Sequence, residues 1–69
     1  MQMINVESSN VKAVGYKKDS STLQVEFING GTYQYFGVPE GVFVELLNSD
    51  SVGGYLASDI KGTYKYSKV

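Results

Sequence analysis

A turn, an alternating strand and a helix start follow one another without interruption in the segment Asn29–Pro39. Its first three residues, Asn-Gly-Gly, favour the positive backbone angles of a tight hairpin turn. Tyr33 and Tyr35 then alternate with polar residues, as in a strand with one buried face. Pro39 suits the first turn of a helix, where its missing N–H costs no hydrogen bond. The segment therefore predicts a change from sheet to helix, which is typical of an α+β fold.

Two further strands are predicted ahead of this turn, at residues 11–18 and 23–28, with the polar segment Asp19-Ser20-Ser21-Thr22 between them. A two-residue turn at Asp19-Ser20 places the apolar side chains of both strands on one face, as a half-buried sheet requires. The pairs predicted by this register are Tyr16 with Leu23, Val14 with Val25, and Lys12 with Phe27.

The length of the second hairpin loop decides whether two tyrosines face the core or the solvent. A two-residue loop, Asn29-Gly30, would place Tyr33 opposite Glu26 and expose both tyrosines as a platform for stacking bases. It would also bury Thr32 and Gln34 without partners, at a cost of about 1–3 kcal/mol for each unpaired group.

We therefore predict a three-residue loop, Asn29-Gly30-Gly31, with one glycine in the left-handed conformation. Phe27 then faces Tyr33, and Val25 faces Tyr35. Both tyrosines become structural residues whose hydroxyls lie at the rim of the core. Phe27 is predicted to lie between the sheet and the first helix.

After Pro39 the apolar residues recur at the spacing of a helix and no longer at every second position. The first helix is predicted to present one apolar stripe, Val42, Phe43, Leu46 and Leu47, and to end near Asn48. A second helix is predicted to begin with Ser51 as its cap, to present Val52, Tyr55, Leu56 and Ile60, and to end at Gly62.

A short final strand is predicted at residues 63–67, where polar and aromatic residues alternate again. The predicted fold is a single α+β domain, residues 1–69. It is an antiparallel β-meander of three strands, then two short helices packed on one face and a C-terminal strand, in the order β-β-β-α-α-β.

The composition excludes several kinds of active site. The 69 residues include no cysteine and no histidine, which removes disulfides, thiol nucleophiles and an imidazole base. We interpret Ser49-Asp50-Ser51 as a capping turn rather than a nucleophile site. Gly53-Gly54 lacks the lysine of a phosphate-binding loop. We predict no catalytic, cofactor-binding or metal-binding residues.

We expect a cytoplasmic chain without a membrane partner, since no apolar run approaches 18 residues.

The charged residues sum to -1, which is typical of a solvated surface of mixed charge, but they are partly segregated along the chain. Lysines lie near both ends, whereas Glu40, Glu45, Asp50 and Asp59 occupy the middle. A nucleic-acid surface would use lysines for phosphates and exposed tyrosines for base stacking. The candidate residues are Lys12, Lys61, Lys65, Lys68, Tyr64 and Tyr66. Strand alternation puts Lys65 and Lys68 on opposite faces, so that weak binding is expected.

The order of several short segments resembles the KTSC domain, over about Met3–Val69. The segments are Ser8-Ser9-Asn10-Val11, Val14-Gly15-Tyr16, Thr22-Leu23-Gln24-Val25-Glu26-Phe27, Asn29-Gly30-Gly31-Thr32-Tyr33-Gln34-Tyr35, Val38-Pro39, Leu46-Leu47 and Ser51-Val52-Gly53-Gly54-Tyr55. That family is named for its occurrence at the C-terminus of some lysyl-tRNA synthetases, and it includes stand-alone proteins of bacteria and phages.

The resemblance implies an accessory domain whose partner in the synthetase context would be RNA. Family members often carry basic residues, an asparagine and a histidine where this chain has Gly54, Ala57 and Asp59. The departure weakens the case for phosphate contact in that segment and leaves Lys61 and Lys65 as its candidates.

Three classes of function remain to be compared: an enzyme, an RNA-binding module and a protein-interaction module. The scattered serines, carboxylates, lysines and tyrosines form no constellation that points to catalysis. We therefore predict a small non-enzymatic binding module with RNA, bound weakly, as its first partner. The alternative is a protein partner bound through a sheet edge or a helix surface.

Overall fold

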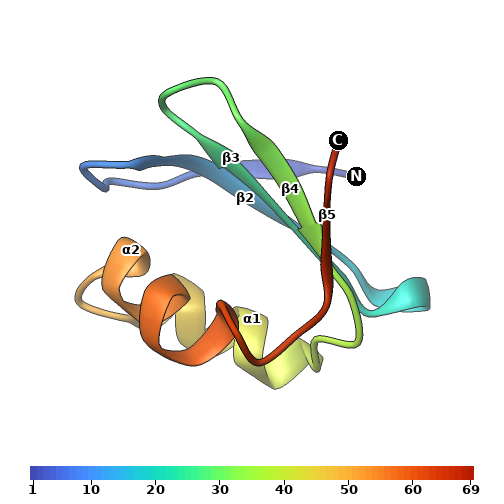
Figure 1. Cartoon of the computed structure of the whole chain (residues 1–69). Helices are drawn as coiled ribbons and strands as arrows, with labels where there is room; N and C mark the ends of the chain where they lie inside the picture. The colour runs from blue at the N-terminus through green and yellow to red at the C-terminus, as the bar shows by residue number, and fades with distance from the viewer.

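One antiparallel sheet of five strands covers a layer of short helices, in a computed structural model that describes residues 1–69 (Figure 1). The strands lie in sequence order, β1-β2-β3-β4-β5. Their bounds are Met3–Asn5 (β1), Val11–Lys17 (β2), Thr22–Phe27 (β3), Thr32–Tyr35 (β4) and Tyr66–Lys68 (β5). The helical segment leaves the sheet after β4 and returns to it at β5, so that β4 and β5 are neighbours despite the long connection.

The predicted meander is confirmed as β2, β3 and β4, and the predicted final strand joins its free edge as β5. The count of three strands in one sheet is too low. β1 was not predicted, because three residues are too few to show alternation in the sequence. The last strand begins at Tyr66 rather than at Thr63.

The hairpin of β2 and β3 has the predicted register over most of its length. Tyr16 pairs with Leu23, and Val14 pairs with Val25. The predicted pairing of Lys12 with Phe27 is wrong, since the register shifts between Val11 and Ala13 and places Val11 opposite Phe27. This β-bulge keeps the apolar Val11 in the core and leaves Lys12 free to pair with Glu26. The chain reverses through a short 3-10 turn, η1 (Lys18–Ser20).

The hairpin of β3 and β4 has a three-residue loop, but its residues are Ile28-Asn29-Gly30. The Phe27 N–H donates to the Gly31 carbonyl over 2.8 Å, and Gly30 takes the positive φ of 100°. The predicted pairs of Phe27 with Tyr33 and Val25 with Tyr35 are therefore wrong by two residues. Tyr33 lies opposite Val25, and Tyr35 lies opposite Leu23.

A shift of two residues preserves the face on which each side chain lies. The two tyrosines consequently stay on the core side, as the loop argument predicts. Tyr35 is buried with 3% of its surface exposed, whereas Tyr33 is half-buried. Gln34 lies on the opposite face, where its side-chain amide donates to Gln24 over 2.8 Å. The Gln34 amide is thus paired on the outer face of the sheet.

The helical layer begins with α1 (Glu40–Asn48), for which Pro39 is the N-cap rather than a residue of the first turn. The second helix is divided into α2 (Val52–Tyr55) and a π-helical turn, η2 (Leu56–Ile60). Ser51 caps α2 as predicted, since its Oγ accepts the Gly54 N–H over 3.0 Å. Gly62 reverses the chain with a φ of 83°.

The core lies between the inner face of the sheet and the helices. Its buried members are Val11, Val14, Leu23, Val25, Tyr35, Val38, Leu46, Val52, Leu56 and Ile60. Phe27 is not among them: its ring is half-buried at the margin of the core, which corrects the expectation of a buried position against the first helix. The aromatic residue that packs against the first helix is Tyr16, itself half-buried and stacked on Phe43 of α1 with ring centroids 5.2 Å apart.

Candidate nucleic-acid interface

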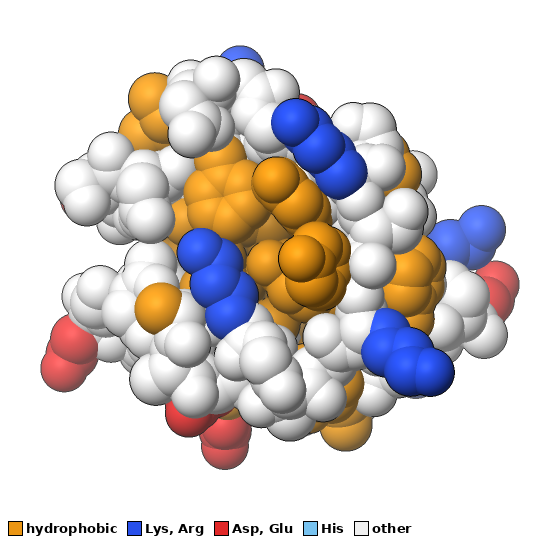
Figure 2. Space-filling model, in the orientation of Figure 1, with side chains coloured by type: hydrophobic (Ala, Val, Ile, Leu, Met, Phe, Trp, Pro, Cys, Tyr) orange, Lys and Arg blue, Asp and Glu red, His pale blue; other side chains and the backbone are white.

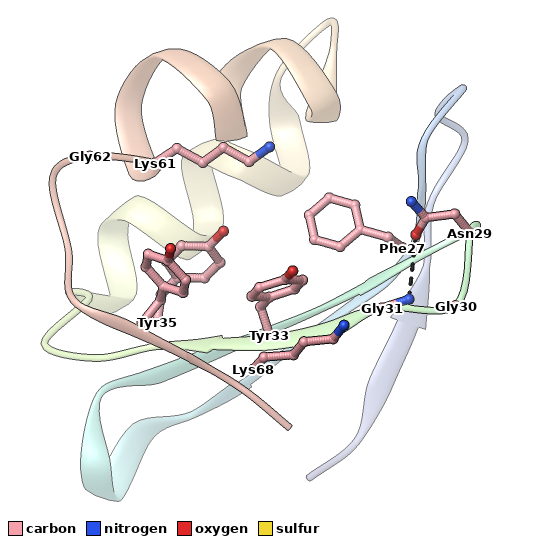
Figure 3. A pocket seen from close by; sticks show the side chains of 10 residues that line it. Phe27, Asn29, Gly30, Gly31, Tyr33, Tyr35, Lys61, Gly62 and Lys68 are labelled. Carbon is pink, nitrogen blue, oxygen red and sulfur yellow. Dashed lines mark hydrogen bonds between the residues drawn. The ribbon is translucent and has the colours of Figure 1, made fainter.

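A groove of about 730 Å³ opens where the β3–β4 loop, the β4–β5 edge and the segment after η2 meet (Figure 3). Four aromatic residues line it: Phe27, Tyr33, Tyr35 and Tyr66. We call this feature the aromatic groove. Its other lining residues are Lys61 and Lys68, Asn29, and the glycines Gly30, Gly31 and Gly62. The volume lies within the usual range for small-ligand sites, roughly 300–1,000 Å³.

The aromatic rings form a connected row. Phe27 meets Tyr33 edge-on with centroids 5.7 Å apart, and Tyr33 lies 5.8 Å from Tyr66. Tyr66 also lies 5.8 Å from Tyr35, which is buried beneath the groove. Because β5 is a short edge strand, Tyr66 keeps 62% of its surface exposed. The row therefore presents accessible ring surface to a flat ligand.

Two lysines flank this row from different elements. The Lys61 ammonium lies 5.4 Å from the centroid of the Phe27 ring, the geometry of a cation–π contact. Lys68 pairs with Tyr33 across β4 and β5. In Figure 3 the two side chains lie on opposite sides of the aromatic rings, Lys61 toward the helices and Lys68 at the sheet.

The aromatic groove is locally positive in a chain of net charge -1. None of the seven acidic residues lines it. The two ion pairs of the structure join Lys12 to Glu26 and Lys18 to Glu40, so that both groove lysines keep their charge unpaired. Figure 2 shows lysine side chains around an exposed hydrophobic patch on this face. The arrangement favours an anionic ligand with an aromatic part.

Burial and the neighbouring phenols Tyr33 and Tyr66 raise the pKa of Tyr35 above its ordinary value of 10.0. Its hydroxyl is therefore neutral at physiological pH, and it places no negative charge beneath the lysines.

The structure brings together three of the six candidate residues: Lys61, Lys68 and Tyr66. Lys12 lies elsewhere, in an ion pair of 3.5 Å with Glu26. Glu26 alternates along β3 with Val25 and Phe27, which face inward, so that this ion pair lies on the outer face of the sheet. Lys65 and Tyr64 precede β5 and do not line the groove, and Tyr64 packs against the core instead.

Phe27 and Tyr33 line the groove although their sequence positions indicated only structural roles. Alternation along a strand places a residue on the inner face of the sheet, but it does not show how much of that face the helices cover. Both residues are half-buried because the helical layer leaves the corner beside the β3–β4 loop uncovered. The one sequence signal at this corner is the run Asn29-Gly30-Gly31 at the β3–β4 turn, whose small residues leave the groove open.

No other cluster of reactive side chains accompanies the aromatic groove. Ser51 is occupied as the cap of α2, and Ser49 donates its hydroxyl to the Leu46 carbonyl over 2.8 Å. No three carboxylate side chains gather as metal ligands would. The helices are all too short to cross a membrane.

Comparisons with known proteins relate nearly the whole chain to one family. The model of the KTSC domain matches residues 7–67. A lysine–tRNA ligase of Nostoc sp. is 40% identical over 67 residues, which are 97% of this chain and 12% of the ligase. An uncharacterised protein of Stutzerimonas stutzeri is 33% identical over 70 residues, covering 100% of this chain and 99% of that protein. The chain thus spans a small part of the ligase and nearly all of the second relative.

A solved structure shows the same fold. The crystal structure of a KTSC domain protein from Yersinia pestis matches with a TM-score of 0.96 and 35% sequence identity. The match covers 99% of this chain and 96% of that protein.

Proposed function

This chain belongs to the KTSC domain family, and from that premise we propose that it is a small non-enzymatic module that binds single-stranded RNA in the aromatic groove. The observation that carries the proposal is the row of partly exposed rings between two unpaired lysines. Aromatic side chains stack on unpaired bases, and lysines hold the adjoining phosphates.

A single strand fits this groove better than a duplex does. In a duplex the faces of the bases are stacked on one another and cannot reach aromatic rings at the bottom of a recess. The relative in Nostoc, whose name makes tRNA its substrate, contains a segment similar to this chain. That context supports RNA as the polymer that the domain meets.

Two lysines limit the strength of binding. The logarithm of the affinity for RNA falls linearly with the logarithm of the salt concentration. For single-stranded RNA the slope of this line is about -0.7 for each phosphate that the protein neutralises. Contacts from Lys61 and Lys68 alone predict a slope near -1.4, below what three or four phosphates would give. We expect a dissociation constant roughly in the range of 10⁻⁴ to 10⁻⁶ M.

A titration of labelled oligouridylate, followed by fluorescence anisotropy at low and at physiological salt, tests the proposal. Lys61→Ala and Lys68→Ala are each expected to weaken binding and to flatten the salt slope by about 0.7. Lys65→Ala is the matched control, since it removes an equal charge from a residue just outside the groove. An absence of binding at low salt would reject RNA as the ligand. An equal loss in all three variants would show that the groove is not the site.

A protein partner is the second candidate, and the edge strand β1 favours it. Ile4 lies in this edge with 44% of its surface exposed. An added strand of a partner could pair with β1 and cover Ile4. The edge is only three residues long, which limits such pairing and ranks this function second.

A further inference from the structure

The aromatic groove has two separate places at which a base can stack. Phe27 and Tyr66 both neighbour Tyr33, at 5.7 and 5.8 Å between ring centroids, and they belong to different strands, β3 and β5. Tyr33 lies between them as a shared wall. Phe27 is half-buried and Tyr66 is mostly exposed, so each offers ring surface of its own.

The groove is open where a strand would enter and leave. Gly30 and Gly31 lie at one end and Gly62 at the other (Figure 3). A Cβ atom added at Gly30 or Gly62 would meet no atom within 4 Å, so that there is free space directly beside the backbone at both ends. A closed pocket for a free base would lack such exits.

The lysines are placed for the phosphates of this strand. Lys61 extends from beside Gly62 toward Phe27, and Lys68 lies along the sheet beside Tyr33 (Figure 3). The Lys61 ammonium rests over the Phe27 ring. A base stacked on that face of the ring would displace the ammonium, which could then bind a phosphate of the same nucleotide.

Resting on the proposed function, we propose that the unit recognised by the groove is a dinucleotide step of single-stranded nucleic acid with two phosphates. One base stacks beside Phe27 and Tyr33, and the next stacks on Tyr66. The phosphates bind Lys61 and Lys68. Two nucleotides therefore saturate the site.

A length series of 5′-phosphorylated uridine nucleotides, from one to six units, tests the dinucleotide unit by calorimetry or by chemical-shift titration. From one to two nucleotides the affinity is expected to rise at least about five-fold, since one additional stacked base alone is worth about 1 kcal/mol or more and the second phosphate adds its contact with a lysine. Beyond two, it is expected to rise only in proportion to the number of positions at which a longer strand can be placed.

Tyr66→Ala is expected to remove most of the gain in affinity from the mononucleotide to the dinucleotide, and to leave only the part that the second phosphate contributes through a lysine. Tyr66→Phe keeps the ring and is expected to restore the dinucleotide affinity. This pair separates the contribution of the ring from that of the hydroxyl group. Thermal melts of both variants establish that the domain remains folded.

The outcomes distinguish this inference from the proposed function. An affinity that grows about equally with every added nucleotide, and that still depends on Lys61 and Lys68, would overturn the dinucleotide unit and leave RNA binding in place. A hexanucleotide that binds more weakly than the dinucleotide would indicate a free dinucleotide as the ligand, with the two-base site intact. No binding by any member at low salt would overturn both.

Discussion

Side chains on one face of this sheet differ in role according to their distance from its edge. Tyr35 and Tyr66 are opposite each other in the β4–β5 pair, yet one is 3% exposed and the other 62%. The helical layer covers the first and leaves the second in the groove. Stability and binding are therefore expected to respond to different members of the same aromatic row.

Tyr35→Ala is expected to leave the domain largely unfolded at room temperature. Removing a buried aromatic side chain costs about 3–5 kcal/mol, and a domain of this size has roughly 5 kcal/mol in total. Circular dichroism melts of Tyr35→Ala and Tyr33→Ala measure the difference, with a smaller loss expected for the half-buried Tyr33. A cooperative melt of Tyr35→Ala near that of the wild type would show that this ring is not in the core.

Tyr55 links α2 to α1 by donating its hydroxyl proton to the Glu45 carboxylate over 2.8 Å. This hydrogen bond, with smaller effects of burial and of the negative charges of Glu45 and Asp59, raises the pKa of Tyr55 to about 12. The bond requires the neutral phenol. Its stabilisation is therefore fully present below the unfolded pKa of 10.0 and is lost as the pH rises through about 12.

Tyr55→Phe is expected to remove the last step of the tyrosinate absorbance titration. Glu45→Gln is the matched variant, since it keeps the phenol and removes the charged acceptor, and it should move this step to lower pH. A titration of Tyr55→Phe that still ends with a step near pH 12 would assign that step to a different tyrosine.

At the scale of elements, the glycines of the helices have unequal roles. A Cβ at Gly53 would lie 2.5 Å from Asn10 Oδ1 and 3.3 Å from Ser8 Oγ, because the loop before β2 packs directly on α2. Ser8 and Asn10 hydrogen-bond to each other over 2.9 Å. A Cβ at Gly41 in α1 would meet nothing within 4 Å. Gly53 thus permits a close contact, and Gly41 only weakens its helix.

Gly53→Ala is expected to lower the free energy of unfolding by about 1–3 kcal/mol through this overlap. Gly41→Ala is expected to raise it by about 0.4–1 kcal/mol, because the unfolded chain loses freedom without strain in the helix. Urea denaturation of the two variants supplies both numbers. The pair is informative because the same substitution is expected to have opposite effects at the two positions. A stabilised Gly53→Ala protein would mean that Asn10 moves aside freely.

At the scale of the whole molecule, the aromatic groove lies at only one of the two edges of the sheet. The groove borders β5, whereas β1 covers the other edge, where Met3 and the chain before it approach Gly15 of β2 closely. The local charge of the groove is likewise distinct from the net charge of -1.

Deletion of residues 1–5 is expected to lower stability and to leave RNA affinity unchanged wherever the domain is still folded. The deletion removes the pairing of β1 with β2 but no residue of the groove. Melting and oligonucleotide titration on the same sample test both halves of this expectation. A folded variant with weakened RNA binding would place part of the site at the β1 edge.

The sequence was sufficient for what depends on local pattern. Alternation before Pro39 and helical spacing after it determined the fold class, and the polarity of Thr32 and Gln34 determined which face Tyr33 and Tyr35 share. The cap at Ser51 followed from its position before an apolar helical run. Lys61, Lys68 and Tyr66 were named as candidates for phosphate and base contact from residue type and place in the chain.

Only the tertiary structure decided what depends on residues distant in sequence. The bulge at Lys12, the two-residue shift of β4 and the strand β1 each arise from pairing between segments, which the local pattern does not encode. The aromatic groove also depends on residues that are distant in sequence. Phe27, Tyr33 and Tyr66 come from three strands, and they meet Lys61 because the chain returns from the helices to the free edge of β4. Local periodicity fixes the face of each side chain, whereas the packing of helices on the sheet determines which part of that face remains open to a ligand.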